Sequence, residues 1–279
     1  MKHRSRATSI PIPSLLILVT ILLHSRAQEV EDEREFDYSR GSEKGPLHWG
    51  ELKKEWAVCK NGEMQSPIDL SSRRVKLISR LGELKKSYES CNATIHNRGH
   101  DIALKWEGDA GSVQISGTDF FLNQSHWHSP SEHTINGRRY DLELHMVHQS
   151  KSPDGKSRIA VVGIMYKIGR PDPFLSKLAE HIKPMADKEE QKGMGVLDPS
   201  EIKMGGKKYY RYIGSLTVPP CTEGVIWTIN KKIRTVSRGQ VELLREAVHD
   251  YAERNARPLQ PLHQRQIYLY GPNARNIHN

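Results

Sequence analysis

The sequence predicts a mainly β protein, a single domain built on a large twisted, mostly antiparallel sheet with a few peripheral helices. Its middle consists of short strand-like runs separated by Gly, Asn and Asp, with connections short enough for hairpins. Only two segments show helical spacing after capping residues, and no internal repeat or linker divides the chain. The 279 residues are 36% hydrophobic and 27% charged, as in a soluble globular protein.

Residues 1–27 are predicted to be a signal peptide. Basic residues precede an apolar run at positions 10–23, and Ser25-Arg26-Ala27 has the small-x-small pattern of a cleavage site. A transmembrane anchor is the alternative, but Pro11 and Pro13 interrupt the run, and about 20 apolar residues are needed to cross a bilayer. We therefore expect a mature domain at 28–279, with its core at about 36–270 and no membrane span.

The elements of the mature domain follow in order. An acidic arm at 29–37 and a short helix at 49–56 come first, and residues 65–70 form a turn into an extended segment. Strands are predicted at 93–96, 101–106, 112–115, 120–128, 140–149 and 158–166. Helices are predicted at 174–182, after Asp172-Pro173, and after the capping box Ser237-Arg238-Gly239-Gln240. Residues 184–207 are predicted to be a surface excursion.

The formal net charge of +9 does not indicate a nucleic-acid-binding protein. The basic residues are scattered, and neither aromatic interleaving nor a helix-turn-helix pattern accompanies them. We expect no nucleic-acid partner.

Two kinds of covalent modification are expected in a secreted chain. Three cysteines, Cys59, Cys91 and Cys221, indicate one disulfide and one odd thiol, and the sequence alone allows three pairings. Acceptors of the form Asn-x-Ser/Thr occur at Asn92 and Asn123. Asn123 lies in a predicted strand, where burial would block it, so Asn92 is the predicted glycosylation site.

The strongest functional signal is the spacing of three histidines. In an extended strand alternate side chains share a face, so His126 and His128 project the same way, about 6.6 Å apart along the strand. The run at 142–148 also alternates, which places Glu143 and His145 on one face. If the two strands are neighbours, three imidazoles meet with a carboxylate behind them.

Three nitrogen ligands without a thiolate favour a catalytic zinc site, because structural zinc usually has four protein ligands, often cysteines. Zinc can then make hydroxide available near neutral pH. A single histidine on a strand is more often a core or surface residue than a metal ligand. The interpretation as a metal site therefore depends on the spacing of the three histidines. A cupin site for manganese or iron is the alternative, since His126-x-His128 followed by Glu132 fits the start of that motif. His145 lacks the proline and glycine expected before it, and Glu132 is either a fourth ligand or an orienting carboxylate.

Beyond these histidines the sequence resembles the α-class carbonic anhydrases, and the segment at residues 126–134 is similar in sequence to that of plant members. The resemblance extends from about residue 36 to residue 267. Its motifs are Gln65-Ser66-Pro67-Ile68, Asn97-Arg98-Gly99-His100, His126-Trp127-His128, Glu143-Leu144-His145, Ser215-Leu216-Thr217-Val218-Pro219-Pro220-Cys221, Arg257-Pro258 and Gln260-Pro261-Leu262.

The resemblance implies a zinc ion held by three ligands, His126, His128 and His145. It implies that Gln124 and Glu143 hold two of these imidazoles in place.

Three further residues match catalytic groups of the family. Thr217 would accept a hydrogen bond from the hydroxide and donate one to Glu132, so that an oxygen lone pair points at the substrate carbon. Without the resemblance, Thr217 is equally suited to cap a turn before Pro219. His100 matches the proton shuttle; we expect it in a solvent-facing turn, with an ordinary imidazole pKa of about 6.5.

Several apolar residues match the substrate pocket of the family, although their pattern alone fits ordinary core. Thr217 and Val218 also match substrate-contacting positions. The matching apolar residues are Val147, Val161, Leu216 and Trp227.

The resemblance also selects a disulfide and reveals two departures. Cys59 and Cys221 match the bridge of secreted members, which leaves Cys91 as the odd thiol. Val218 stands where many relatives have a second threonine, and Ala103 where some have an asparagine. We therefore expect an active enzyme that is slower or less sensitive to inhibitors.

The sequence thus predicts a zinc-dependent carbonic anhydrase, a lyase that interconverts carbon dioxide with bicarbonate and a proton. The alternative is a non-enzymatic storage or binding protein on the same fold; such relatives often lose ligand histidines, and this chain has lost none. We expect secretion to the extracellular space (the apoplast), with a plastid reached through the secretory pathway as the alternative.

Overall fold

The protein is described here from a computed structural model, which defines residues 35–151, 157–186, 188 and 190–272. The predicted signal peptide lies outside these residues. Within them, no helix is both long enough and apolar enough to cross a membrane.

The described chain is dominated by strands. They are β1 (Val75–Leu77), β2 (Lys85–Tyr88), β3 (Cys91–Asn97), β4 (Ile102–Glu107), β5 (Gly111–Ile115), β6 (Thr118–His128), β7 (Thr134–Ile135), β8 (Arg138–Arg139), β9 (Leu142–Ser150), β10 (Ile159–Ile168), β11 (Gln191–Leu197), β12 (Tyr209–Ser215), β13 (Glu223–Asn230), β14 (Arg234–Val236) and β15 (Ile267–Tyr270). The helices are α1 (Trp49–Leu52), α2 (Val58–Asn61), α3 (Pro173–Ile182) and α4 (Arg238–Ala247), with 3-10 turns η2 (Lys54–Trp56), η3 (Lys183–Met185), η4 (Pro199–Glu201) and η5 (Asp250–Ala252).

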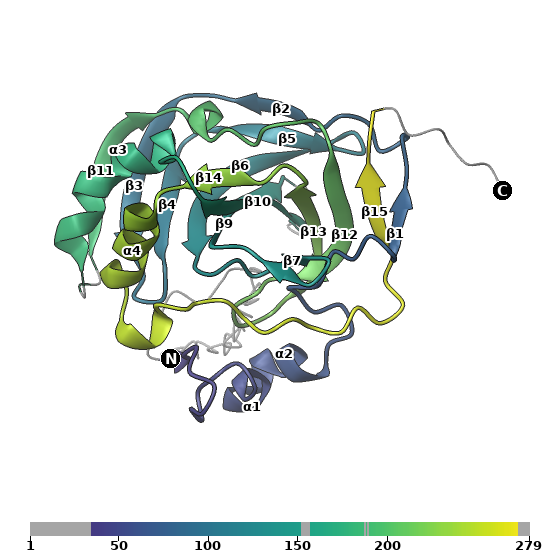
Figure 1. Cartoon of the computed structure of the whole chain (residues 1–279), viewed down its shortest axis with the longest axis horizontal. Helices are drawn as coiled ribbons and strands as arrows, with labels where there is room; N and C mark the ends of the chain where they lie inside the picture. Colours follow the sequence, from purple (N-terminus) through teal and green to yellow (C-terminus); the bar gives the residue numbers. More distant parts are fainter. Residues whose placement is uncertain (1–34, 152–156, 187, 189, 273–279) are drawn as a thin grey trace, which may run out of the picture.

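One large, strongly curved sheet organises these elements (Figure 1). Within the described residues it has 13 strands, with the path β1-β15-β12-β13-β10-β9-β6-β4-β3-β11, while β14 pairs with β10, and β5 with β2 and β6. The pairs β1 with β15, β10 with β13 and β10 with β14 are parallel, and the others are antiparallel. The predicted fold class is therefore confirmed.

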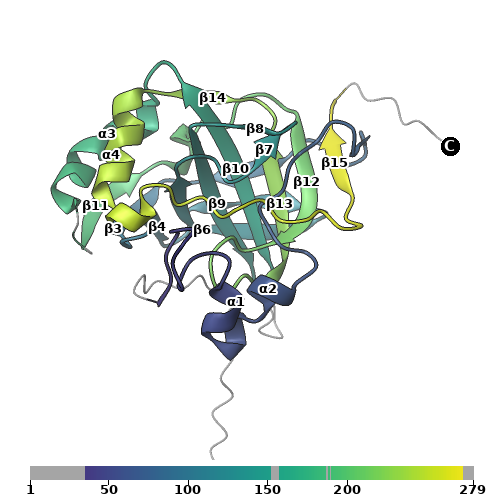
Figure 2. The ribbon, with the colours of Figure 1, turned by 60° about the horizontal axis from the view of Figure 1, so that its bottom comes forward.

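The longer helices lie at one end of the sheet, as predicted. Figure 1 shows α3 and α4 together beside β3 and β4, and Figure 2 shows α1 and α2 below the strands. The side chain of Asp172 caps α3 by accepting from the backbone N–H of Leu175, and Ser237 and Gln240 form the expected capping box of α4. Gln240 also bonds the backbone of Asp172 through both its amide atoms, at 2.9 and 2.8 Å, which fixes the two helix starts together.

The surface excursion predicted at 184–207 is wrong in its middle. Residues Gln191–Leu197 form β11, which pairs antiparallel with β3 at the edge of the sheet. Its side chains are mostly exposed and it contains Gly193 and Gly195, so no alternation of apolar residues marks it. An edge strand of this kind is specified by backbone pairing with its one neighbour.

The central strands are buried on both faces of the sheet. On β10, Val161 packs in one apolar cluster with Val147, whereas the adjacent Val162 packs in the other with Met146. His145 belongs to the Val147 face by strand alternation. The sheet therefore offers the histidines an interior position rather than a surface one.

Candidate metal centre

The register of β6 and β9 brings the three histidines together. The strands are antiparallel, with His126 opposite His145 and His128 opposite Glu143. The ring centroids lie 5.0 Å apart for His126 and His128, 5.1 Å for His126 and His145, and 4.6 Å for His128 and His145. All three side chains are buried, and each offers one nitrogen within 4.8 Å of the others.

Each ring is fixed by a hydrogen bond on its far nitrogen. Nδ1 of His126 bonds Oε1 of Gln124 at 3.2 Å, and Nε2 of His145 bonds Oε1 of Glu143 at 2.8 Å. Nδ1 of His128 bonds the backbone oxygen of Asn255 at 2.8 Å. These oxygens are acceptors, so the ring nitrogens that meet them must carry the protons.

When the three rings are neutral, their opposite nitrogens present lone pairs to one another. Nε2 of His126 lies 3.3 Å from Nδ1 of His145. Nε2 of His128 is buried and has no hydrogen-bond partner among the described residues. Two lone pairs at that distance repel unless a proton or a cation lies between them. The set is three imidazoles with no thiolate, and it fits zinc.

A second group of potential ligands, His133, Glu143 and His145, is joined by hydrogen bonds among its own members. Oε1 of Glu143 accepts from Nδ1 of His133 at 2.7 Å and from Nε2 of His145 at 2.8 Å. Oε2 of Glu143 accepts from the backbone N–H of His133 at 2.8 Å. Hydrogen bonds thus occupy the facing atoms of this group.

The group instead begins a buried chain of hydrogen bonds to β12. Nε2 of His133 bonds the hydroxyl of Tyr212 at 2.7 Å, and that hydroxyl bonds Oγ of Ser66 at 2.7 Å. Ser66 and Ser215 exchange two further bonds, at 2.9 and 3.0 Å. Glu143 is thereby held on two sides, and the orientation of His145 depends on residues from β12 and from the turn at 65–70.

Electrostatics in this region follow from burial and from these contacts. Burial alone would raise the pKa of the Glu143 carboxyl, but His133 and His145 more than offset it, and the pKa lies well below its usual range. Burial lowers the pKa of His145, which favours the neutral ligand form. Burial would also lower the pKa of His128, but the carboxylate of Glu132 raises it. A cation among the three nitrogens would favour the neutral form of all three rings.

Comparisons with known proteins identify the family of this chain. The family model for eukaryotic-type carbonic anhydrase matches residues 44–271. The chain is 53% identical over 277 residues to alpha carbonic anhydrase 7 of Arabidopsis thaliana, covering 98% of this chain and 99% of that relative. This chain belongs to the α carbonic anhydrase family.

Two solved structures show how far the likeness extends. The crystal structure of dioscorin complexed with ascorbate has a TM-score of 0.81 and 44% identity, covering 85% of this chain and 98% of that one. The α-carbonic anhydrase of Thermovibrio ammonificans, complexed with the inhibitor sulfanilamide, has a TM-score of 0.76 and 37% identity, covering 84% and 98%. The fold is therefore shared by one protein that is complexed with ascorbate and another that is complexed with sulfanilamide.

The apolar residues expected beside the carbonic anhydrase metal form part of one cluster. Val147, Val161, Leu216 and Trp227 are all buried in the cluster on the histidine face. The Trp227 ring centroid lies 4.8 Å from that of His145. Val218, in contrast, packs in the other cluster.

The loop that carries Thr217 is fixed, although one expected hydrogen bond is not present. The backbone N–H of Leu216 donates to the oxygen of Thr222 at 3.0 Å, and Thr217 is only 3% exposed. Among the described residues no hydrogen bond joins Thr217 to Glu132. Oε1 of Glu132 accepts from the backbone N–H of Arg257 at 2.9 Å, and its buried Oε2, 3.7 Å from Nε2 of His128, has no hydrogen-bond partner in the described chain.

His100 does not face solvent as the sequence led us to expect. It is fully buried, its ring centroid lies 5.2 Å from that of Phe36, and its Nε2 lies 3.7 Å from Oδ2 of Asp101. The reason is the N-terminal segment, since Phe36 also packs edge-to-face against Trp49. A long-range contact of this kind leaves no signal in the turn sequence itself.

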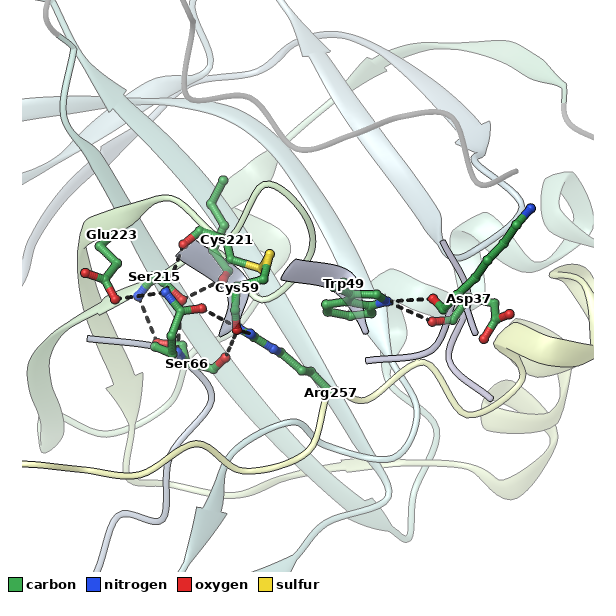
Figure 3. Close-up of a disulfide and its surroundings, with 11 residues drawn as sticks. Asp37, Trp49, Cys59, Ser66, Ser215, Cys221, Glu223 and Arg257 are labelled. Carbon is green, nitrogen blue, oxygen red and sulfur yellow. Dashed lines mark hydrogen bonds between the residues drawn. A yellow bond between two sulfur atoms is a disulfide. The ribbon is translucent and has the colours of Figure 1, made fainter. Parts of the chain in front are cut away.

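The predicted disulfide between Cys59 and Cys221 is confirmed, with an S–S distance of 2.05 Å (Figure 3). Beside it, the buried guanidinium of Arg257 donates through Nη2 to the backbone oxygen of Cys59 at 2.8 Å and through Nη1 to that of Ser66 at 2.8 Å. Burial lowers the pKa of Arg257 to about 10. The Thr217 loop is thus tied covalently to α2, and the 65–70 turn is fixed to the same point.

The remaining modification sites are found on β3 and β6. Cys91 is the free cysteine of the described chain and is partly exposed. Asn92 is exposed at the start of β3. Asn123 is exposed as well, because the register of β6 against β9 shifts between Leu122 and Gln124 and leaves it in a bulge. The expected burial of Asn123 is therefore wrong, and occupancy at Asn92 stays a prediction.

Three functional neighbours escaped the sequence reasoning: Asn255, His133 and Arg257. Asn255 supports His128 through its backbone oxygen, an atom that every residue has. His133 was part of the recognised 126–134 segment, and its position ten residues before Glu143 gave no sign of contact. Arg257 was recognised only as a motif, and its contacts span 191 to 198 residues in sequence.

Proposed function

We propose that this chain is a zinc-dependent carbonic anhydrase that interconverts carbon dioxide with bicarbonate and a proton. The observation that carries the proposal is the convergence of one nitrogen from each of three buried imidazoles, within 4.8 Å of one another and 3.3 Å apart for His126 and His145. Zinc held there would supply a Lewis acid that makes hydroxide available at neutral pH.

The protein's own residues would orient the attacking oxygen, provide an apolar wall for the substrate and carry the released proton away. In the zinc-bound protein the hydroxyl of Thr217 is proposed to donate to Oε2 of Glu132, a buried carboxylate oxygen without a hydrogen-bond partner in the described chain. That bond would leave the lone pair of Thr217 as an acceptor and thereby orient the attacking oxygen. The backbone N–H of Arg257 holds the carboxylate in place for this role.

The substrate would lie beside the histidines on an apolar wall. Val147, Val161, Leu216 and Trp227 offer no hydrogen-bond donor or charge toward a ligand except the indole N–H, which is already donated to the backbone oxygen of Ser215 at 2.9 Å. Such a wall suits a small uncharged molecule such as carbon dioxide. Thr217 and Val218 are proposed to contact it as well.

His100 is proposed to carry the proton away. Its imidazole is suited to pass protons at neutral pH, and Asp101 is close enough to stabilise the protonated ring. Because the ring is buried against Phe36, transfer to bulk solvent would require the Phe36 segment or the ring to move.

The test is a measurement of zinc content followed by carbon dioxide hydration by the purified mature chain. We expect one zinc per chain and hydration that a chelator abolishes and added zinc restores. His145→Ala should lose the metal, because two imidazoles rarely hold zinc tightly. Properly folded, zinc-loaded protein without hydration would refute the proposal.

A non-enzymatic storage or binding protein is the second candidate, favoured by the dioscorin likeness, whose structure is a complex with ascorbate. Stoichiometric zinc together with hydration excludes it, whereas ascorbate binding without hydration would establish it. The cupin alternative of the sequence analysis is wrong, because the chain belongs to the α carbonic anhydrase family.

We further propose that the chain enters the secretory pathway. The disulfide between Cys59 and Cys221 supports this route, because such bonds persist in oxidising compartments. The apoplast is the proposed destination, with the plastid as the alternative. The cleaved leader at 1–27, the mature domain at 28–279 and the glycan on Asn92 belong to the same proposal, and the mass of the secreted protein tests all three.

A further inference from the structure

The face of the sheet away from the histidines carries a pocket with a buried arginine. Arg211 lies on β12 between Tyr210 and Tyr212, which pack in the cluster on the histidine face. Because side chains alternate along a strand, Arg211 points to the other face. There it lines a pocket of about 300 Å³ together with Arg80, Ser116 and Tyr209. Figure 1 shows β12 between β13 and β15 in the sheet.

Arg211 has no acidic partner. Its side chain is 9% exposed, its Nε donates to Oγ1 of Thr228 at 2.9 Å, and its guanidinium lies 5.1 Å from the ring centroid of Tyr209. Its two terminal nitrogens form no hydrogen bond or ion pair within the described chain, and they are not among its fully buried atoms, so they face the solvent of the pocket. A buried cation without a counter-charge costs free energy, and in most proteins such groups are paired.

The acidic groups near the pocket are engaged elsewhere. Glu83 lines it, but Oε2 of Glu83 accepts from Nζ of Lys207 at 3.0 Å. Asp119 accepts from Nε2 of Gln114 at 3.1 Å. The second arginine of the lining, Arg80, is exposed at the pocket mouth. With Glu83 paired to Lys207, the two arginines leave the lining of the pocket with a net positive charge.

The geometry points to a binding site for a phosphate group in this pocket, held by Arg211 and Arg80. A guanidinium presents a planar fork of N–H donors that matches two oxygens of a phosphate at once. The Nε of Arg211 donates to Thr228, and the planar face of its guanidinium packs over the ring of Tyr209. These two contacts pre-orient the terminal nitrogens. The hydroxyl of Ser116, in the tight turn between β5 and β6, adds a neutral donor.

The site is independent of the histidine centre. It lies on the other face of the sheet, and none of its residues contacts a proposed zinc ligand. The phosphate-site proposal is therefore independent of the proposed carbonic anhydrase activity, and its test does not measure that activity.

The test is calorimetric titration of the purified full protein with inorganic phosphate, and in a second arm with glycerol 3-phosphate, both at constant chloride and ionic strength. We expect saturable binding that Arg211→Gln weakens at least about tenfold, since a hydrogen bond to a charged group is lost. Arg80→Gln should weaken it several-fold without touching the sheet interior. The ratio of the two arms tells whether free phosphate or a monoester is the better ligand.

The matched control is Arg138→Gln. Arg138 is exposed on β8, and its guanidinium lies 5.3 Å from the ring centroid of Tyr140, so this variant removes the same charge and a similar arginine–tyrosine contact outside the pocket. Its phosphate affinity should equal that of the wild type. Binding no stronger than that of chloride, or affinity that Arg80→Gln and Arg211→Gln leave unchanged, would overturn the proposal. If Arg211→Gln fails to fold, the Arg80→Gln titration decides alone.

Discussion

His148 should make the protein lose stability in mild acid. It lies on β9 three residues after His145, on the opposite face, with no exposed surface. Its Nε2 bonds the hydroxyl of Tyr88 at 3.0 Å, and the two rings stack with centroids 5.9 Å apart. Burial lowers the pKa of His148 to about 4 from the ordinary 6.5.

The sign and the size of this change in the free energy of unfolding follow from linkage between protonation and folding. The unfolded chain binds a proton at His148 below pH 6.5 and the native chain only below about 4, so the free energy of unfolding falls as the pH drops through that window. Between pH 7.5 and pH 5 this group should cost about 2 kcal/mol, and the loss should level off near 3 kcal/mol below pH 4.

The assay is urea unfolding at several pH values between 5 and 7.5, for the wild type and for His148→Gln. The variant removes the titration while keeping a polar group for Tyr88, so its stability should fall by about 2 kcal/mol less over that range. The free energy of unfolding of the variant at pH 7.5 is not the readout, because the substitution also removes packing of the imidazole. Acid release of a metal is common to both proteins and cancels in the difference.

His263→Asn is the control for this experiment. His263 is exposed and has a φ of 51°, a conformation that asparagine tolerates, so its pH profile should match that of the wild type. If His148→Gln loses as much stability between pH 7.5 and pH 5 as the wild type, the buried neutral imidazole is not the cause and the reasoning fails.

Three further outcomes are expected. Replacing Cys59 and Cys221 together by Ser opens a closure of 162 residues and should lower the free energy of unfolding by about 2 to 5 kcal/mol in urea, whereas Cys91→Ser should change it by less than about 0.5 kcal/mol; equal effects would contradict the structural role of the bridge. Glu143→Gln should weaken zinc binding by about 10- to 100-fold in a chelator competition, because it alters the bond that orients His145, and an unchanged affinity would show that the network on β12 does not act on the metal. His100→Ala should slow carbon dioxide hydration in dilute buffer and recover part of the rate with added imidazole, while turnover that is independent of buffer would remove the shuttle role.

The histidine set was predictable because it depends on local geometry. Alternation along a strand places His126 with His128, and Glu143 with His145, whatever the rest of the chain does. Only the adjacency of the two strands had to be assumed, and the register of β6 on β9 supplies it. The caps of α3 and α4 were predictable for the same reason, since each involves residues within three positions.

The supports of the site were predictable only where a side chain contacts its near neighbours. Gln124 and Glu143 are each two residues from the histidine that they hold; strand alternation predicted Glu143, and the resemblance to the family predicted Gln124. The support of His128 comes from a backbone oxygen 127 residues away, and that of Glu143 continues through His133 to Tyr212 over 79 residues. Such contacts are set by the path of the chain, and no local pattern reports them.

Two of the errors of the sequence reasoning, at β11 and at His100, share one physical origin. Both concern segments whose environment is supplied by a partner distant in sequence: β3 for the edge strand, and Phe36 for the imidazole. At β11 the missed feature is the strand itself, since its side chains are mostly exposed; at His100 the polar turn led us to infer an exposure that the packing of Phe36 removes. A polar segment is exposed only if nothing else in the chain covers it. For His100 this difference matters to function, because a buried imidazole must gain access to solvent before it can release a proton, and the packing of Phe36 on Trp49 and His100 is then part of the rate.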